Sequence, residues 1–301
     1  MAPMSSFEKE FTPASALQVA LLCILFGANP VAVKISLAGF GPLTTAGIRF
    51  GVAAVIIFFW ARVTNRPLTV AKKHRIPLTF IGLILTGQIC LFYIGMTKTY
   101  ATHGAILSNL LPFCVLIFAH YLVKNDRITA RKVIGMLMGF SGVAVVLMDK
   151  NGMQPGVKSG DFILLGAILL WSCRIILTKI TVTECEPFHT VFYPFVFAAP
   201  LFLAGGALFD PKMVIHIDFA VICALLYQIV VVACFGFIIW NTFLKKYGAS
   251  SLHSFNFIMP IAGVCFSALL IDEAITPHLF TALILIVSGL LVIHYRPSHS
   301  R

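Results

Sequence analysis

Two arginines lie inside stretches of otherwise apolar sequence, Arg49 within residues 42–61 and Arg174 within residues 160–181. A charge at membrane depth costs about 2.5–3.5 kcal/mol on insertion scales, so such a side chain usually faces a cavity or a partner. A guanidinium group binds a carboxylate or a phosphate through paired hydrogen bonds. The two arginines therefore predict a site for an anionic group. The alternative is a structural role, in which each arginine bonds to backbone carbonyls near prolines or reaches the membrane interface.

Uncharged polar residues at similar depth could complete this site. Asn109 and Asn256 occupy equivalent positions in two similar halves of the chain, and Gln88 lies in a third apolar stretch. These residues predict a polar ring in a cavity wall, or else hydrogen bonds between helices. Prolines interrupt the same segments and could act as hinges, because a proline removes one helical hydrogen bond. The hinge or kink candidates are Pro30, Pro112 and Pro260.

Two histidines near the ends of apolar stretches, His103 and His253, are candidates for carrying a coupling proton, because histidine titrates near neutral pH. An interfacial structural role is the alternative. No carboxylate is predicted deep inside a span, which argues against a carboxylate proton relay and leaves facilitated diffusion or exchange open. The eight cysteines form no C-x-x-C pair. We therefore expect no metal and no cofactor.

The elements that must position these residues are membrane helices. The chain has 301 residues, of which 59% are hydrophobic and 11% are charged. A soluble domain is about 25% charged, so the bilayer is the expected solvent. Ten apolar stretches are long enough to span it. They lie at about 15–37, 42–61, 77–97, 102–122, 130–148, 160–181, 187–208, 218–242, 249–270 and 277–295.

Lysine and arginine are unevenly shared between the two predicted sides. Fifteen fall in loops or at helix ends on one side and four on the other. Positive residues collect in cytoplasmic loops, so both termini are predicted to be cytoplasmic. This distribution explains the net charge of +11 without a nucleic-acid partner. The basic loop at 62–75 is either a topology signal or a contact with anionic lipid headgroups.

The chain is also duplicated. Motifs around Asn29, Lys34 and Thr44 recur about 145 residues later, with Lys179 as the partner of Lys34. A five-span unit followed by its copy must cross the membrane in the opposite sense, which is how many secondary transporters are built. The expected division is a cytoplasmic tail at 1–14, a first repeat at 15–148, an extracytoplasmic linker at 149–159, a second repeat at 160–295 and a C-terminal tail at 296–301.

Several motifs together resemble the EamA-type transporters of the drug/metabolite transporter superfamily. These are ILFGANPVAVK at 24–34, THGAILSNLLP at 102–112, DRIT at 126–129 and DEAIT at 272–276. The resemblance covers about residues 15–295. The chain departs from it at Phe26-Gly27, where the family usually has Trp-Gly, and at Asn125-Asp126, where Gly-Glu is common. These departures leave the fold prediction intact. They argue against assigning to this chain the substrate of any one family member.

The resemblance implies ten helices around a central cavity lined mainly by spans 1, 3, 4, 6, 8 and 9. It therefore adds Trp171 and Tyr93 as candidate cavity residues. It also implies movement of small polar metabolites, often amino acids or their derivatives and often outward. Spans 5 and 10 would lie outside, and Gly135-x-x-x-Gly139 would serve helix packing or a homodimer.

The resulting hypothesis is a multi-pass secondary transporter in the bacterial inner membrane. By alternating access it would expose its binding site to one face of the membrane and then to the other. Its partners would be a small-molecule substrate and membrane lipid. A flippase for a lipid or a lipid-linked sugar is the alternative. An intramembrane enzyme is disfavoured, because the sequence lacks H-E-x-x-H, paired deep carboxylates and Gly-x-Ser-x-Gly.

Overall fold

The computed structural model describes residues 12–122, 129–148, 157–253 and 255–294. The predicted tails at 1–14 and 296–301 and the predicted linker at 149–159 fall mostly or wholly outside these residues. The described chain is all-helical and contains no β-strand, apart from a single bridge between Phe40 and Val214. This agrees with the all-helical part of the predicted fold class, and the ten spans and cytoplasmic termini stay predictions.

Within the described residues, the first half of the chain forms six helices and the second half forms seven helical segments, one of them a π-helix. Their bounds are α1 Pro13–Ser36, α2 Pro42–Val63, α3 Lys72–Thr97, α4 Ala101–Ser108, α5 Leu111–Leu122, α6 Ala130–Met148, α7 Val157–Val182, α8 His189–Phe209, α9 Phe219–Leu226, η1 Tyr227–Gly236, α10 Phe237–His253, α11 Ile258–Ile271 and α12 Pro277–His294. Within the described residues, seven helical stretches are long and apolar enough to cross a membrane, and α11 and α12 are shorter apolar helices.

One predicted boundary is wrong. The sequence predicts that a span ends near residue 242, but α10 continues to His253 and α11 begins only at Ile258. The apolar side chains of the added turns explain the difference. Tyr247 and Leu252 are buried in a cluster with residues of α1 and α7, while Lys245 and Lys246 lie on the exposed face. In the sequence, this pair of adjacent lysines therefore resembled a loop after the end of a span.

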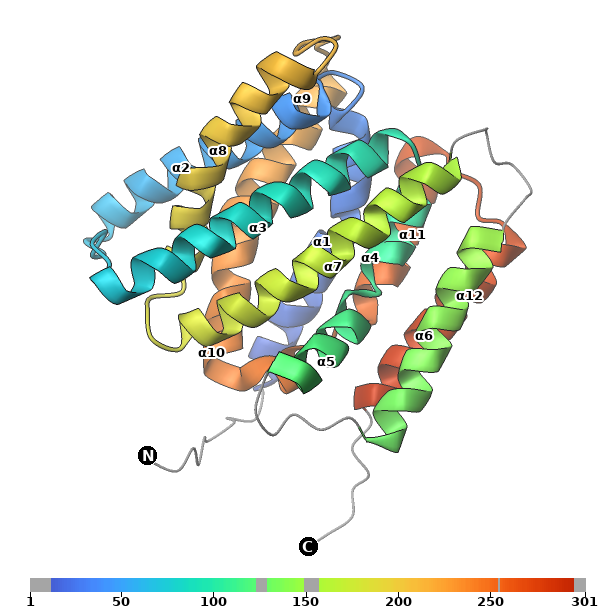
Figure 1. The fold of residues 1–301 in the computed structure, drawn as a ribbon. Helices are drawn as coiled ribbons and strands as arrows, with labels where there is room; N and C mark the ends of the chain where they lie inside the picture. The colour runs from blue at the N-terminus through green and yellow to red at the C-terminus, as the bar shows by residue number, and fades with distance from the viewer. Residues whose placement is uncertain (1–11, 123–128, 149–156, 254, 295–301) are drawn as a thin grey trace, which may run out of the picture.

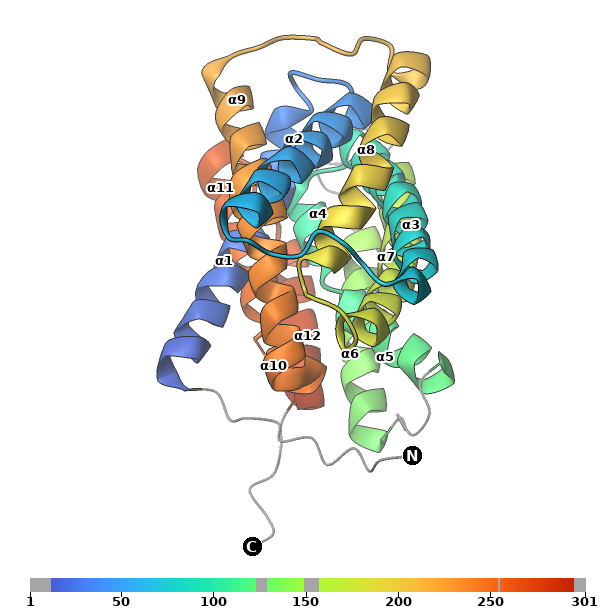
Figure 2. The ribbon, with the colours of Figure 1, turned by 90° about the vertical axis from the view of Figure 1, so that its left-hand side faces the viewer.

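The helices pack mainly as antiparallel pairs (Figure 1). α3 packs along α7, α2 along α8 and α6 along α12, whereas α1 packs against α11 in the same direction, with Val19 near Ile258 and Lys34 near Glu273. Figure 1 shows α6 and α12 together at the right side of the bundle, which is the far side in Figure 2. Their contact depends on glycine, because a Cβ at Gly135 would lie 2.6 Å from the carbonyl oxygen of Gly289. The predicted small-residue motif is thus used for packing within the chain.

Polar contacts hold α2 and α8 together at both ends. The carboxylate of Asp210, just after α8, accepts hydrogen bonds from the backbone N–H and the hydroxyl of Thr44 at the start of α2, at 2.8 and 2.7 Å. At the opposite ends, Arg66 pairs with Glu186 at 3.1 Å. These two helices are the second spans of the two similar halves, so equivalent helices run in opposite directions.

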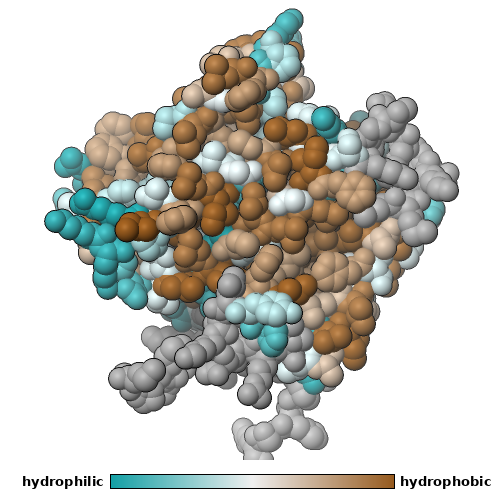
Figure 3. Space-filling model, viewed as in Figure 1, coloured by the Kyte–Doolittle hydropathy of each residue, from teal (hydrophilic) through white to brown (hydrophobic). Residues whose placement is uncertain are grey.

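The outer surface of the bundle is largely apolar (Figure 3). Large hydrophobic side chains are more than half exposed on several helices, including Phe59 on α2, Phe80 on α3 and Phe162 on α7. A surface of this kind needs an apolar solvent, because soluble monomers rarely expose contiguous apolar patches of more than a few hundred Å². The hydrophilic patch on the left of Figure 3 lies over the start of α3 in the same view.

Candidate functional site

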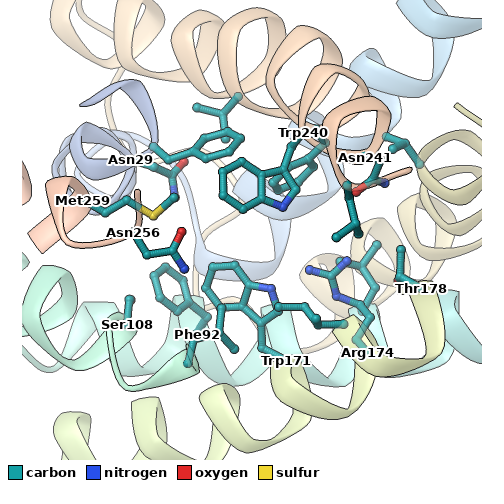
Figure 4. Close-up of a pocket in the computed structure, with 18 of the residues that line it drawn as sticks. Asn29, Phe92, Ser108, Trp171, Arg174, Thr178, Trp240, Asn241, Asn256 and Met259 are labelled. Atoms are coloured by element: carbon teal, nitrogen blue, oxygen red, sulfur yellow. The ribbon is translucent and has the colours of Figure 1, made fainter. Parts of the chain in front are cut away.

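A cavity of about 150 Å³ lies among the helices of both halves (Figure 4). Its walls come from α1, α3, α4, α5, α7, α8, η1, α10 and α11. The lining residues on α7 include Thr178, one turn before that helix ends, and those on α8 include Thr190 in its first turn. The cavity therefore extends toward the end of the bundle where α7 connects to α8.

Of the described residues that line the cavity, Arg174 is the one with a charged side chain. Its Nε donates a hydrogen bond of 2.8 Å to Oε1 of Gln88 on α3. No other hydrogen bond or ion pair is formed by Arg174 within the described part of the chain, so its two terminal nitrogens remain available. Figure 4 shows the guanidinium group directed into the space between Trp171 and Trp240. These nitrogens have the planar donor geometry that suits a carboxylate or phosphate.

Two further polar groups at the cavity are buried without a partner in the described structure, Oδ1 of Asn29 and Oγ1 of Thr178. A buried polar atom without a hydrogen bond costs about 1–3 kcal/mol, so such atoms are suited to meeting a ligand or water. Figure 4 places Thr178 beside Arg174, whereas Asn29 lies at the other end of the cavity near Asn256. The cavity thus has two polar ends, and only one of them carries a charge.

Aromatic rings form much of the wall between these ends. Phe26 packs against Trp240 with ring centroids 5.7 Å apart, and Trp171 packs edge-on against Phe92 at 6.5 Å. Figure 4 shows the indole rings of Trp171 and Trp240 on opposite sides of the space. Such a wall favours a planar or apolar ligand body, and the polar ends would fix its orientation.

The second deep arginine has a different environment. Arg49 is 2% exposed and does not line the cavity. Its Nη1 donates to Tyr93 Oη at 3.1 Å and to Gln228 Oε1 at 3.3 Å, and its guanidinium lies 5.1 Å from the ring centroid of Phe50. Gln228 in turn donates to Ser36 Oγ at 2.9 Å, so the network joins α2 and α3 to η1 and α1. This hydrogen-bond network therefore joins helices of the two halves of the chain.

The predicted binding residues divide into two groups. Trp171, Arg174, Asn109 and Asn256 line the cavity, whereas Arg49, Tyr93 and Gln88 do not. Gln88 is linked to the site through its hydrogen bond with Arg174.

The hinge and coupling candidates are more scattered. Pro30 and Pro112 line the cavity, and Pro260 is buried in α11 outside its lining. His253 ends α10, and its side chain is outside the described part of the structure.

His103 lies apart from the cavity in a second buried polar cluster. Its Nδ1 is 3.0 Å from Oδ2 of Asp161, and the hydroxyl of Thr99 donates to Oδ1 of the same carboxylate at 2.6 Å. Asp161 is fully buried on α7. Nearby, Glu273 accepts hydrogen bonds from the backbone N–H groups of Ala101 and Thr102, which begin α4. The sequence placed Asp161 at a helix end, and it gave no sign of this burial.

Some lining residues were missed as site candidates. Asn29, Thr178 and Trp240 are examples. A signal for one of them was present, because Asn29 is the repeat equivalent of Arg174 and Phe26 is that of Trp171. All four line the cavity, so equivalent turns of α1 and α7 face the same space from the two halves.

Comparisons with known proteins agree with the fold. A model of the EamA-like transporter family matches residues 14–148 and again residues 158–295. The chain is 26% identical over 281 residues to the "Probable amino-acid metabolite efflux pump" of Escherichia coli (strain K12), covering 90% of this chain and 92% of that protein. It is 24% identical over 271 residues to the "S-adenosylmethionine/S-adenosylhomocysteine transporter" of Chlamydia muridarum (strain MoPn / Nigg), covering 84% and 83%. A solved crystal structure with 18% identity superposes with a TM-score of 0.69 over 94% of this chain and 97% of that one, which supports the fold.

Proposed function

The chain belongs to the EamA-like transporter family, and from that premise we propose that it moves a small polar metabolite with an anionic group across the membrane. Members similar to it are named as transporters and efflux pumps, so the protein is a multi-pass membrane transporter and not an enzyme. The proposal adds a substrate class and a site to this general function.

One observation carries the substrate class. Arg174 places an unmatched charge in the cavity, and no carboxylate is among the lining residues. Because a guanidinium group in an apolar site is costly, the charge is best explained by a ligand that neutralises it. We assign the anionic group of the substrate to the Arg174 end, where Thr178 can donate an additional hydrogen bond. Asn29 would meet a neutral hydrogen-bonding group at the other end.

Amino acids, amino-acid derivatives and organic anions satisfy this description. An acidic group would contact Arg174, and an aromatic or aliphatic body would lie between Trp171 and Trp240. The relative named as an amino-acid metabolite efflux pump makes export a reasonable expectation for this chain. The cavity volume of about 150 Å³ is close to that of an engineered cavity that binds benzene, so larger substrates require the helices to part.

The mechanism we propose is alternating access by two inverted repeats, 15–148 and 160–295, with both termini in the cytoplasm of a bacterial inner membrane. The antiparallel packing of the equivalent helices α2 and α8 supports the inversion. The cavity extends toward the proposed cytoplasmic side. On the other side, the Arg49 network and the Asp161 cluster join the two halves, and both would have to open to release substrate outward.

The experiment is a flux assay in proteoliposomes loaded with radiolabelled amino acids, acylated amino acids, organic acids, nucleosides and polyamines. We expect protein-dependent flux for compounds with a carboxylate and none for polyamines. Flux confined to cations, or movement of fluorescent phospholipid without any metabolite flux, would contradict the proposal. The second of these results would favour the flippase.

A further inference from the structure

A second hollow lies on the outside of the bundle, between the start of α3 and the first half of α8. Its volume is about 730 Å³. Most of its lining is apolar, with Thr69, Arg75 and Thr79 as the polar exceptions. The lining residues are Leu68, Thr69, Val70, Arg75, Leu78, Thr79, Tyr193, Val196, Phe197, Pro200 and Leu201. None of them lines the central cavity.

The walls of this groove are fixed by contacts at both ends. At the deep end, which is the end away from the loop 64–71, α3 and α8 approach closely, since a Cβ at Gly82 would lie 3.0 Å from Cδ1 of Phe197. At the shallow end the loop 64–71 is tied to α8, where Nε2 of His189 lies 2.7 Å from the carbonyl oxygen of Pro67 and the hydroxyl of Tyr193 donates to the carbonyl of Leu68. The groove is therefore part of the folded structure and not a gap between loosely packed helices.

The groove extends from the helix ends into the apolar band. Along α8 it runs from Tyr193 to Leu201, which is roughly 12 Å at 1.5 Å per residue. Exposed apolar side chains flank it, including Ile76 and Phe80 on α3 and Leu203 on α8. An acyl chain is the ligand that such a surface meets in a bilayer.

The shallow end is basic. Lys73 is paired with Glu184 at 2.8 Å, and its hydrogen bond and charge lower the pKa of that carboxyl. Arg66 is paired with Glu186. Arg75 is exposed and lines the groove, and it forms no ion pair within the described residues. One unmatched guanidinium group is therefore placed where an apolar groove reaches the helix ends.

We propose that this groove binds one phospholipid with an anionic headgroup, with its phosphate at Arg75 and an acyl chain along Phe197 and Leu201. A basic residue near a membrane surface contributes about 1 kcal/mol of attraction to an anionic lipid, which is roughly a fivefold preference. The bound lipid would contact α8, whose other face lines the central cavity through Thr190, Val191 and Pro194.

The test is native mass spectrometry of the purified full chain titrated with phosphatidylglycerol, phosphatidylethanolamine or phosphatidylcholine. We expect one phosphatidylglycerol to be retained with about fivefold preference over the other two lipids. Arg75→Gln should abolish this preference. The matched control is Arg62→Gln, which removes an exposed arginine at the end of α2 outside the groove and should leave the preference unchanged.

A second pair of variants tests the apolar part. Val196→Trp fills the groove and should lower retention of all three lipids, whereas Leu208→Trp, at an exposed position on the same helix outside the groove, should not. The proposal is overturned if the three lipids bind equally to the wild type, if Arg75→Gln keeps the preference, or if millimolar inorganic phosphate displaces the lipid. A dimer mass that persists only when the groove is unfilled would assign it to a second copy of the chain. All these readouts are independent of transport.

Discussion

Arg49 and Arg174 both lie at membrane depth, yet their surroundings differ: Arg49 is buried and Arg174 is partly exposed. Arg49 is held by Tyr93 and Gln228 and lies over Phe50, away from the cavity. Among the residues that the structure describes, Arg174 is held through Nε alone, and its remaining donors face the cavity. A deep charge therefore marks a binding site only where its donors remain available to a ligand. Where protein groups engage it, the same residue type joins helices.

The comparison predicts its largest effect at Arg174. Arg174→Gln should weaken substrate binding about 10- to 100-fold, because a hydrogen bond to a charged group contributes about 1.5–3 kcal/mol. The melting temperature without ligand should change little. Ligand titration followed by thermal stability measures both quantities. Arg62→Gln is the control, and equal loss of binding in that variant would remove the special role of Arg174.

Arg49→Gln should show the reverse pattern. Its loss removes two hydrogen bonds in a buried network, at a cost of about 1.5–3 kcal/mol in the free energy of unfolding. The melting temperature in detergent should fall, while the folded protein binds substrate with nearly unchanged affinity. If binding falls as steeply as in Arg174→Gln without a loss of stability, the distinction between the two arginines is wrong.

Gln88 sharpens the comparison because it positions Arg174 without lining the cavity. Gln88→Ala should reduce substrate affinity several-fold, in line with about 0.5–1.5 kcal/mol for one hydrogen bond. Gln88→Glu should reduce it further, since the new carboxylate would neutralise the guanidinium that the substrate needs. Binding that is indifferent to Gln88→Glu would argue against an anionic ligand group.

The smallest effect is expected at Asn29, the repeat equivalent of Arg174. Asn29→Ala removes one neutral hydrogen bond and should weaken binding about two- to fivefold. The preference for anionic over neutral ligands should remain as in the wild type. A loss of that preference, measured by competition, would indicate that the anionic group binds at the Asn29 end of the cavity and not at the Arg174 end.

Much of this fold was predictable because a long apolar stretch of sequence is enough to identify a membrane helix. The apolar stretches, the duplication and the family followed from sequence. Four of the predicted binding residues, Trp171, Arg174, Asn109 and Asn256, line the cavity, and their role in binding stays a prediction. Which face of a helix looks inward could not be read in the same way, because α7 is apolar on all sides. For that reason substrate binding and a structural role both stayed open for Arg49 and Arg174, and the burial of Asp161 against His103 was not foreseen.

The most direct test of the central claim compares two ligands on two proteins. A carboxylate identified in the flux assay and its neutral amide analogue are titrated against the wild type and Arg174→Gln, with binding read as thermal stabilisation. The wild type should bind the carboxylate at least tenfold more tightly than the amide, and the variant should bind both about equally. If the variant still prefers the carboxylate by the same factor, Arg174 does not recognise the anionic group.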